Sequence, residues 1–127
     1  MLLNKIAMIK LAKREEQIMQ AFWQLEKAFI KEIIPQLPNP KPHYNTVATI
    51  VKILEDKGFL AHEAVGNIFQ YYPIVSREQY QKHAIKDIVS QYFNNSYPNM
   101  LAYFAKEQKI SDTELKEIVK LIKSSKK

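Results

Sequence analysis

The sequence of 127 residues contains no cysteine and only two glycines. Without cysteine, disulfides, thiolate metal sites and thiol nucleophiles are excluded, and few glycines favour a helix-rich fold with few tight turns. No apolar run approaches the roughly 18 residues of a membrane-spanning helix, so we expect no membrane insertion. Residues 1–13 alternate lysine with apolar residues and lack a signal-peptide pattern. We interpret them as a short leader or first helical turn and expect a soluble, cytoplasmic protein.

The chain also lacks the common signatures of an active site. It has no glycine-rich phosphate loop and no nucleophile elbow. The carboxylate pairs Glu15-Glu16 and Glu55-Asp56 are interpreted as solvated charges on exposed helix faces, not as a general acid–base pair. No metal-ligand spacing is formed by the three histidines, which are His43, His62 and His83. We therefore expect no enzyme activity, no cofactor and no metal site.

What the sequence does contain is enough apolar residues for a core and an excess of positive charge. The hydrophobic fraction of 46% suits a packed core in a chain with the length of one ordinary domain. A net charge of +6 favours a polyanionic partner such as DNA, although a merely basic, solvated surface is the alternative. Residues 1–75 carry nine Lys and Arg against seven Asp and Glu, and residues 76–127 carry ten against six. The excess is therefore not concentrated in the N-terminal part.

The spacing of apolar residues predicts three helices and a hairpin in the first 75 residues. Gly66-Asn67 joins two strand-like runs, and such a two-residue link is typical of a β-hairpin. The predicted order is a helix over 13–25, a helix over 28–37 that Pro35 shortens or kinks, a proline-rich turn at 38–42, a helix over 44–57 that ends at Gly58, and strands over 59–65 and 68–74.

Two capping boxes organise the rest of the chain, one at 76–79 and one at 111–114. They predict helices over 77–93 and from 112 onward, with a break at 94–96 and a short helix over 98–106 between them. The apolar faces of these helices exceed what this stretch can bury alone, which favours a dimer interface over an intramolecular core. The predicted dimerisation residues are Ile85, Ile88, Val89, Tyr92, Phe93, Leu101, Phe104, Leu115, Ile118, Val119 and Ile122.

Three helices followed by a hairpin are the plan of a winged helix-turn-helix, which places its third helix in the DNA major groove. We therefore predict a mainly α fold with a small β-hairpin, with a winged-helix DNA-binding domain in residues 1–75 and a helical dimerisation domain in residues 76–127. The candidate DNA-binding residues lie in or just before the 44–57 helix and are His43, Tyr44, Asn45, Thr46, Thr49 and Lys52.

Each of these residue types has a role in DNA recognition. Asn45 can pair with adenine, whereas Thr46 and Thr49 can bond to phosphate or touch a thymine methyl. Lys52 and the two residues before Asn45 can contact backbone phosphates. The alternative interpretation is that Asn45 and Thr46 only cap an exposed helix.

Several stretches of the chain resemble the penicillinase-repressor family of transcriptional repressors. They are EEQIM (15–19), FWQL (22–25), YNTVATI (44–50), LEDKG (54–58) and QYYPIVS (70–76). The resemblance spans about residues 11–124, and 46–49 together with Lys57-Gly58 are its most specific parts. It implies a homodimer whose winged helices bind a palindromic operator in double-stranded DNA. It also implies that transcription is repressed until the repressor is inactivated.

The chain departs from that family at three places. Its expected wing carries Glu63, where family wings are basic, and this carboxylate would repel phosphate. In the β-lactamase repressors, a membrane sensor-peptidase triggers cleavage at an Asn-Phe bond. The aligned pair in this sequence is Tyr103-Phe104. We therefore regard this pair as the candidate cleavage site and such a peptidase as a candidate partner. The cysteine ligands of the copper-responsive members are absent, which rules out that mode of sensing.

An alternative function is a winged-helix protein-interaction module without specific DNA binding. The near-neutral N-terminal part and the acidic wing favour it. Binding to DNA weakens steeply with salt, whereas binding to an apolar protein surface does not, so a salt series separates the two functions.

Overall fold

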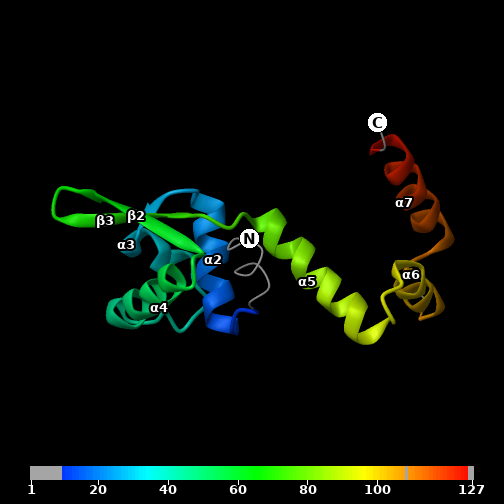
Figure 1. The fold of residues 1–127 in the computed structure, drawn as a ribbon, viewed down its shortest axis with the longest axis horizontal. Helices are drawn as coiled ribbons and strands as arrows, with labels where there is room; N and C mark the ends of the chain where they lie inside the picture. The colour runs from blue at the N-terminus through cyan, green and yellow to red at the C-terminus, as the bar shows by residue number, and fades with distance from the viewer. Residues whose placement is uncertain (1–9, 108, 126–127) are drawn as a thin grey trace. The chain divides into compact units, whose positions relative to one another are not determined.

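A computed structural model describes residues 10–107 and 109–125 (Figure 1). Most of the predicted leader, residues 1–9, lies outside the described residues. No helix among the described residues is long and apolar enough to cross a membrane. The elements are α2 (Lys13–Leu25), β1 (Ala28–Phe29), α3 (Ile30–Ile33), a 3-10 helix η1 (Ile34–Gln36), α4 (Tyr44–Asp56), β2 (Leu60–Val65), β3 (Ile68–Pro73), α5 (Arg77–Tyr92), α6 (Tyr97–Lys106) and α7 (Asp112–Ser125).

The core of the N-terminal unit forms where the apolar faces of α2 and α4 meet each other and the sheet. Spacings of three and four residues put the apolar side chains of each helix on one face. Fully burying one such side chain contributes roughly 1.5–3 kcal/mol. The helices predicted over 13–25 and 44–57 are confirmed. Their fully buried residues are Ile18, Met19 and Phe22 in α2, and Val47, Val51 and Leu54 in α4.

The predicted hairpin is confirmed as the antiparallel pair β2–β3. Val65 lies opposite Ile68, and the chain reverses over Gly66-Asn67. Gly66 has a φ of 63°, a left-handed conformation that glycine adopts without strain and that two-residue hairpin turns require. We call the β2–β3 hairpin (Leu60–Pro73) the wing.

The sheet has a third strand, so the prediction of a helix starting at residue 28 is wrong at its first two residues. Ala28 pairs with Tyr71 and Phe29 with Gln70, which gives the strand order β1-β3-β2. This pairing covers part of the edge of β3 that does not face β2. The chain then continues into α3 at Ile30. A proline at the start of η1 then tightens the segment, in agreement with the expected short helix.

The chain forms two compact units, Met1–Ala84 and Ile85–Lys127, which divide within α5. Tyr80, in the second turn of α5, is buried in the N-terminal core. Its hydroxyl donates a hydrogen bond to Glu16 Oε2 at 2.7 Å and accepts one from the Leu11 N–H at 3.2 Å. The first turns of α5, predicted as part of the C-terminal domain, therefore pack with the winged helix.

Both predicted capping boxes are confirmed. In the first, the Ser76 N–H donates to Gln79 Oε1 at 2.8 Å, and the Gln79 N–H donates to Ser76 Oγ at 3.1 Å. Ser111 and Glu114 form the same reciprocal pair with the same distances at the start of α7. Each box satisfies two backbone N–H donors at the start of a helix, which explains why these helices begin where they do.

Candidate nucleic-acid interface

One face of α4 is polar and exposed to solvent. Asn45, Thr49 and Lys52 lie on the side of the helix opposite the buried valines and leucine, and Thr46 is exposed in the same first turn. The sequence produces this arrangement because apolar residues at 47, 51 and 54 hold the other face in the core. The predicted DNA-contacting side chains of α4 are thus gathered on an accessible surface.

The start of α4 is not capped by the side chains of Asn45 or Thr46. The residue that caps the helix is His43, and no side chain makes a capping hydrogen bond there. Asn45 and Thr46 lie inside the first turn, so the alternative interpretation that they only cap the helix is wrong. His43 and Tyr44 are also exposed.

Thr49 makes one hydrogen bond within the helix. Its hydroxyl Oγ1 donates to the backbone carbonyl of Asn45 at 2.9 Å. Such a bond to the carbonyl four residues earlier is a common arrangement for threonine in helices. The hydroxyl hydrogen of Thr49 is therefore already engaged by the protein.

The wing contacts α4 near the C-terminal end of the helix. His62 Nδ1 in β2 lies 2.5 Å from Glu55 Oε2 in α4. The imidazole ring stacks on Phe69 of β3, with a distance of 4.1 Å between ring centroids. Two strands of the wing thus pack around one side chain that also contacts α4, and the wing follows one flank of the helix.

Glu63, the acidic residue of the wing, is paired with a cation. Lys27 Nζ lies 2.6 Å from Glu63 Oε1 and 5.6 Å from the ring centroid of Tyr72. Both charged groups are about half exposed, so the pair contributes at most about 1 kcal/mol to stability. Its electrostatic effect matters more, since it offsets the charge that we expected to repel phosphate. The wing tip beyond it, residues 64–69, carries no charged side chain.

Three of the four carboxylates that we interpreted as solvated charges make hydrogen bonds within the protein, so that prediction is wrong for Glu15, Glu16 and Glu55. Glu15 is buried, and its carboxylate accepts hydrogen bonds from Lys57 Nζ and the Ala12 N–H, each at 2.7 Å. Burial by itself raises the pKa of Glu15, but these two partners together lower it below the ordinary value. The hydrogen bond to Glu16 adds to the effect of burial in raising the pKa of Tyr80 to about 12.

These groups hold α2 to the end of α4 and to α5. Among the described residues, no group of three histidine, aspartate or glutamate side chains is placed to hold a metal ion.

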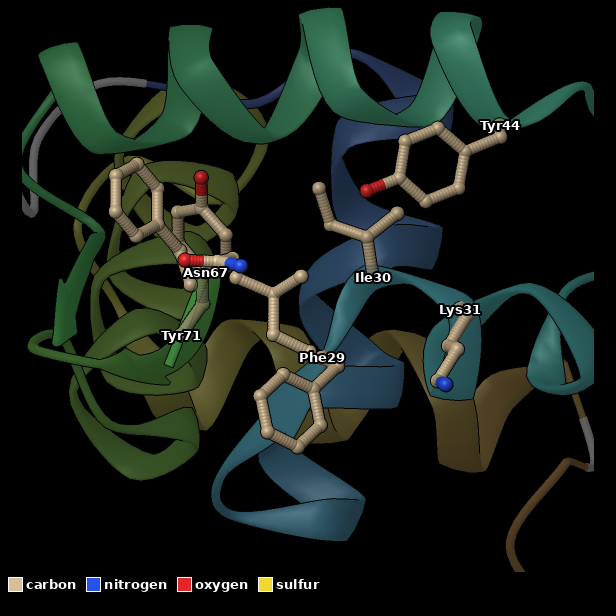
Figure 2. Close-up of a pocket in the computed structure, with 8 residues that line it drawn as sticks. Phe29, Ile30, Lys31, Tyr44, Asn67 and Tyr71 are labelled. Carbon is tan, nitrogen blue, oxygen red and sulfur yellow. The ribbon is translucent and has the colours of Figure 1, made fainter. Parts of the chain in front are cut away.

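A pocket that the sequence did not predict lies between α3, the start of α4 and the wing (Figure 2). It has a volume of about 270 Å³, and Ile30, Lys31, Tyr44 and Asn67 are among the residues that line it. Its residues come from segments up to about forty positions apart, so no local pattern marks it. Burial raises the pKa of Tyr71 at one side of the pocket, with Glu55 and Tyr44 adding to the effect.

Most of the predicted dimerisation residues remain accessible in the single chain. Ile85, Ile88 and Val119 are close to half exposed, and Tyr92 is 72% exposed. Partial burial is found for Phe93, Leu101, Phe104, Leu115 and Ile118.

Two of the predicted dimerisation residues stand apart from the others. Val89 is buried within the single chain and therefore supports the fold of its own unit. The side chain of Ile122 lies outside the described residues. The sequence reasoning missed two exposed apolar side chains nearby, Tyr97 and Leu121, because it counted apolar residues by helical spacing alone.

The candidate cleavage pair lies inside α6. Tyr103 is half exposed and Phe104 is partly buried, and their rings pack against each other with centroids 5.6 Å apart. Tyr103 also packs against Phe93 at the same centroid distance. The peptide bond between Tyr103 and Phe104 is thus part of a helix stabilised by aromatic contacts.

The arrangement of α2, α3 and α4 followed by the β2–β3 hairpin defines the chain as a winged-helix protein. Residues 11–124 match the family described as penicillinase repressor, and the chain belongs to this family. Members of this family are regulatory DNA-binding proteins and not enzymes.

Individual relatives are similar over most of their length. The chain is 22% identical over 110 residues to the methicillin resistance regulatory protein MecI of Staphylococcus aureus (strain N315), a match that covers 86% of this chain and 89% of that protein. The protein of the same name from Staphylococcus epidermidis matches with the same figures. That from Mammaliicoccus sciuri is 22% identical over 114 residues.

Proposed function

We propose that this transcriptional regulator is a sequence-specific repressor that binds a palindromic operator as a homodimer. The observation that carries the proposal is the exposed polar face of α4, in a winged helix whose family consists of DNA-binding regulators. Asn45 is assigned to an adenine edge, and Thr46 and Thr49 are assigned to the floor of the major groove. Lys52, with His43 and Tyr44, is assigned to backbone phosphates.

The proposed dimer uses the accessible apolar side chains of the C-terminal unit. Ile85, Ile88, Tyr92 and Val119 offer apolar surface to a second copy. A two-fold dimer presents two copies of α4 to two half-sites, which lie one helical turn of DNA or a multiple of it apart, roughly 34–36 Å per turn. Repression then follows because the bound dimer covers the promoter and excludes polymerase.

Inactivation is proposed to occur by cleavage between Tyr103 and Phe104, with a membrane sensor-peptidase as the partner that starts it. Because this bond lies within α6, a protease reaches it when the helix opens locally. Substituting Tyr103, which precedes the bond and is not among the predicted dimerisation residues, then blocks induction and leaves DNA binding intact. The check is to follow the length of the protein in cells before and after induction.

The experiment that tests the function is binding of the purified protein to a labelled fragment of its own promoter. Scrambled competitor DNA and a salt series accompany each titration, because phosphate contacts weaken steeply with salt. Tight, salt-sensitive binding that survives competitor supports a specific repressor. Binding no better than to scrambled DNA at every salt concentration would favour the protein-interaction module instead.

A further inference from the structure

The pocket between α4 and the wing combines an apolar floor with polar groups. Ile30 is buried beneath it, and Ile68 and Phe69 of the wing contribute half-exposed apolar side chains. In Figure 2 the hydroxyl of Tyr44 and the amide of Asn67 point toward each other across Ile30, and Lys31 lies at the edge. The pocket therefore suits an amphipathic group with a carbon face and an anionic end.

The position of the pocket in a winged helix indicates which amphipathic group binds there. A helix in the major groove and a hairpin that reaches the adjacent minor groove are separated by one sugar–phosphate strand of the duplex. Here the start of α4, at Tyr44, and residues 67–69 of the wing form two walls of the pocket. The strand between the two grooves would have to pass between these walls.

We propose that the pocket holds one deoxyribose-phosphate unit of the DNA backbone, an inference that rests on the proposed function. The sugar packs on Ile30, Ile68 and Phe69. The phosphate accepts hydrogen bonds from the Tyr44 hydroxyl and the Asn67 amide and is neutralised by Lys31. The proposal adds Lys31 and Asn67 to the DNA contacts, and it gives the uncharged wing a way to bind DNA without basic residues.

The dimensions of the pocket favour a unit of a polymer over a free metabolite. Its volume of about 270 Å³ falls below the ~300–1,000 Å³ of pockets that enclose a drug-sized ligand. Tyr44, Ile68 and Phe69 are each about half exposed, so the pocket opens to solvent and cannot surround a ligand. A chain that enters on one side and leaves on the other needs an opening of this kind.

The test replaces single phosphates of the bound DNA. A high-affinity duplex is selected from random sequences with the wild-type protein, and each backbone position in turn receives one neutral methylphosphonate linkage. The wild-type protein is expected to lose affinity at every linkage whose phosphate it contacts. At the one linkage in each half-site that lies in the pocket, the loss should be about tenfold, because hydrogen bonds to a charged group are lost there. In the double variant Tyr44→Phe and Asn67→Ala, the loss at that linkage should largely disappear, and the losses at other linkages should remain.

Lys31 is tested separately through salt. Lys31→Ala should weaken binding to all duplexes and lower the salt slope by about 1, as expected for one lost phosphate contact. Lys13→Ala is the matched control, because it removes the same charge from α2, outside the pocket. All three substituted pocket residues are exposed, so thermal unfolding should be unchanged and a weaker complex would not reflect misfolding.

Three results would overturn the proposal. If the double variant shows the same pattern of linkage losses as the wild-type protein, the pocket does not hold the backbone, although the proposed function stands. If free 2-deoxyribose 5-phosphate displaces DNA at micromolar concentration from the wild-type protein only, the pocket is a small-molecule site. If no duplex is bound at any salt concentration, the proposed function fails together with this inference.

Discussion

The two compact units of the chain differ in how far each completes its own core. With the exception of Val89, every buried side chain among the described residues lies between Leu11 and Tyr80. The C-terminal unit has three amphipathic or partly apolar helices and leaves Tyr92 and Leu121 mostly exposed and Val119 close to half exposed. The N-terminal unit therefore has a buried core of its own, whereas the C-terminal unit has apolar surface that is available to the proposed dimer.

This difference predicts that losing an aromatic side chain lowers the stability of the N-terminal unit much more than that of the C-terminal unit. Phe22→Ala should destabilise the N-terminal unit by roughly 3–5 kcal/mol, because it removes a fully buried ring and leaves a cavity. Tyr92→Ala, at a 72% exposed position in the other unit, should change the stability of a dilute sample by less than about 0.5 kcal/mol. Urea unfolding of both variants measures this, and similar losses at the two positions would remove the contrast between the units.

Self-association should depend on the C-terminal unit alone. Ile88→Glu places a charge in the proposed apolar interface and should weaken dimerisation by about 2 kcal/mol or more, roughly 30-fold. Val65→Glu is the matched control, because Val65 is equally exposed but belongs to the wing. Sedimentation velocity over a concentration series gives the dissociation constants. If Val65→Glu causes dissociation and Ile88→Glu does not, the interface includes the wing and the prediction is wrong.

Base recognition should depend on the N-terminal unit and leave the dimer intact. Asn45→Ala should lower affinity for the selected site by about 1–3 kcal/mol while binding to scrambled DNA is nearly unchanged. Lys52→Ala should instead weaken binding to both DNAs alike and reduce the salt slope by about 1. Titrations at several salt concentrations measure both effects. An equal loss on both DNAs for Asn45→Ala would argue against its role in base reading.

The smallest expected effect concerns the buried carboxylate of the N-terminal unit. Because the pKa of Glu15 is lowered in the folded state, its contribution to stability is complete above the ordinary value near 4.5 and is lost as pH falls through the folded value. Glu15→Gln should therefore lower stability at pH 7 by about 1 kcal/mol and reduce the loss of stability on acidification. Urea unfolding at pH 7 and pH 3 tests this. Glu26→Gln, at the exposed end of the same helix, is the control and should behave as the wild-type protein.

The elements that could be predicted from the sequence are those with local signals. The 13-residue helices α2 and α4 have apolar residues every three or four positions, and Gly66-Asn67 marks the hairpin by itself. Both capping boxes are four-residue patterns. The polar face of α4 follows from the same periodicity, since knowing the buried face fixes the exposed one.

What could not be predicted depends on contacts between distant positions. The two residues of β1 are too few for a periodic pattern and become a strand only because β3 offers an edge, more than forty residues later. Glu15 and Lys57 are separated by 42 positions, so no local pattern predicts their ion pair, and the sequence alone indicates a solvated carboxylate. The pocket beside Tyr44 needs three elements to be in place before it exists.

In the proposed complex with DNA, the hydrogen bond from Thr49 to the carbonyl of Asn45 restricts the bases that this position can distinguish. With its only polar hydrogen held by the backbone, the side chain offers lone pairs and a methyl group to whatever lies in the groove. It can accept a hydrogen bond from the exocyclic amino group of adenine or cytosine, and its methyl group can pack on that of thymine. Guanine presents two acceptors in the major groove and so has no complementary group here. In the proposed complex, a contact within the protein thus limits the bases that Thr49 can recognise.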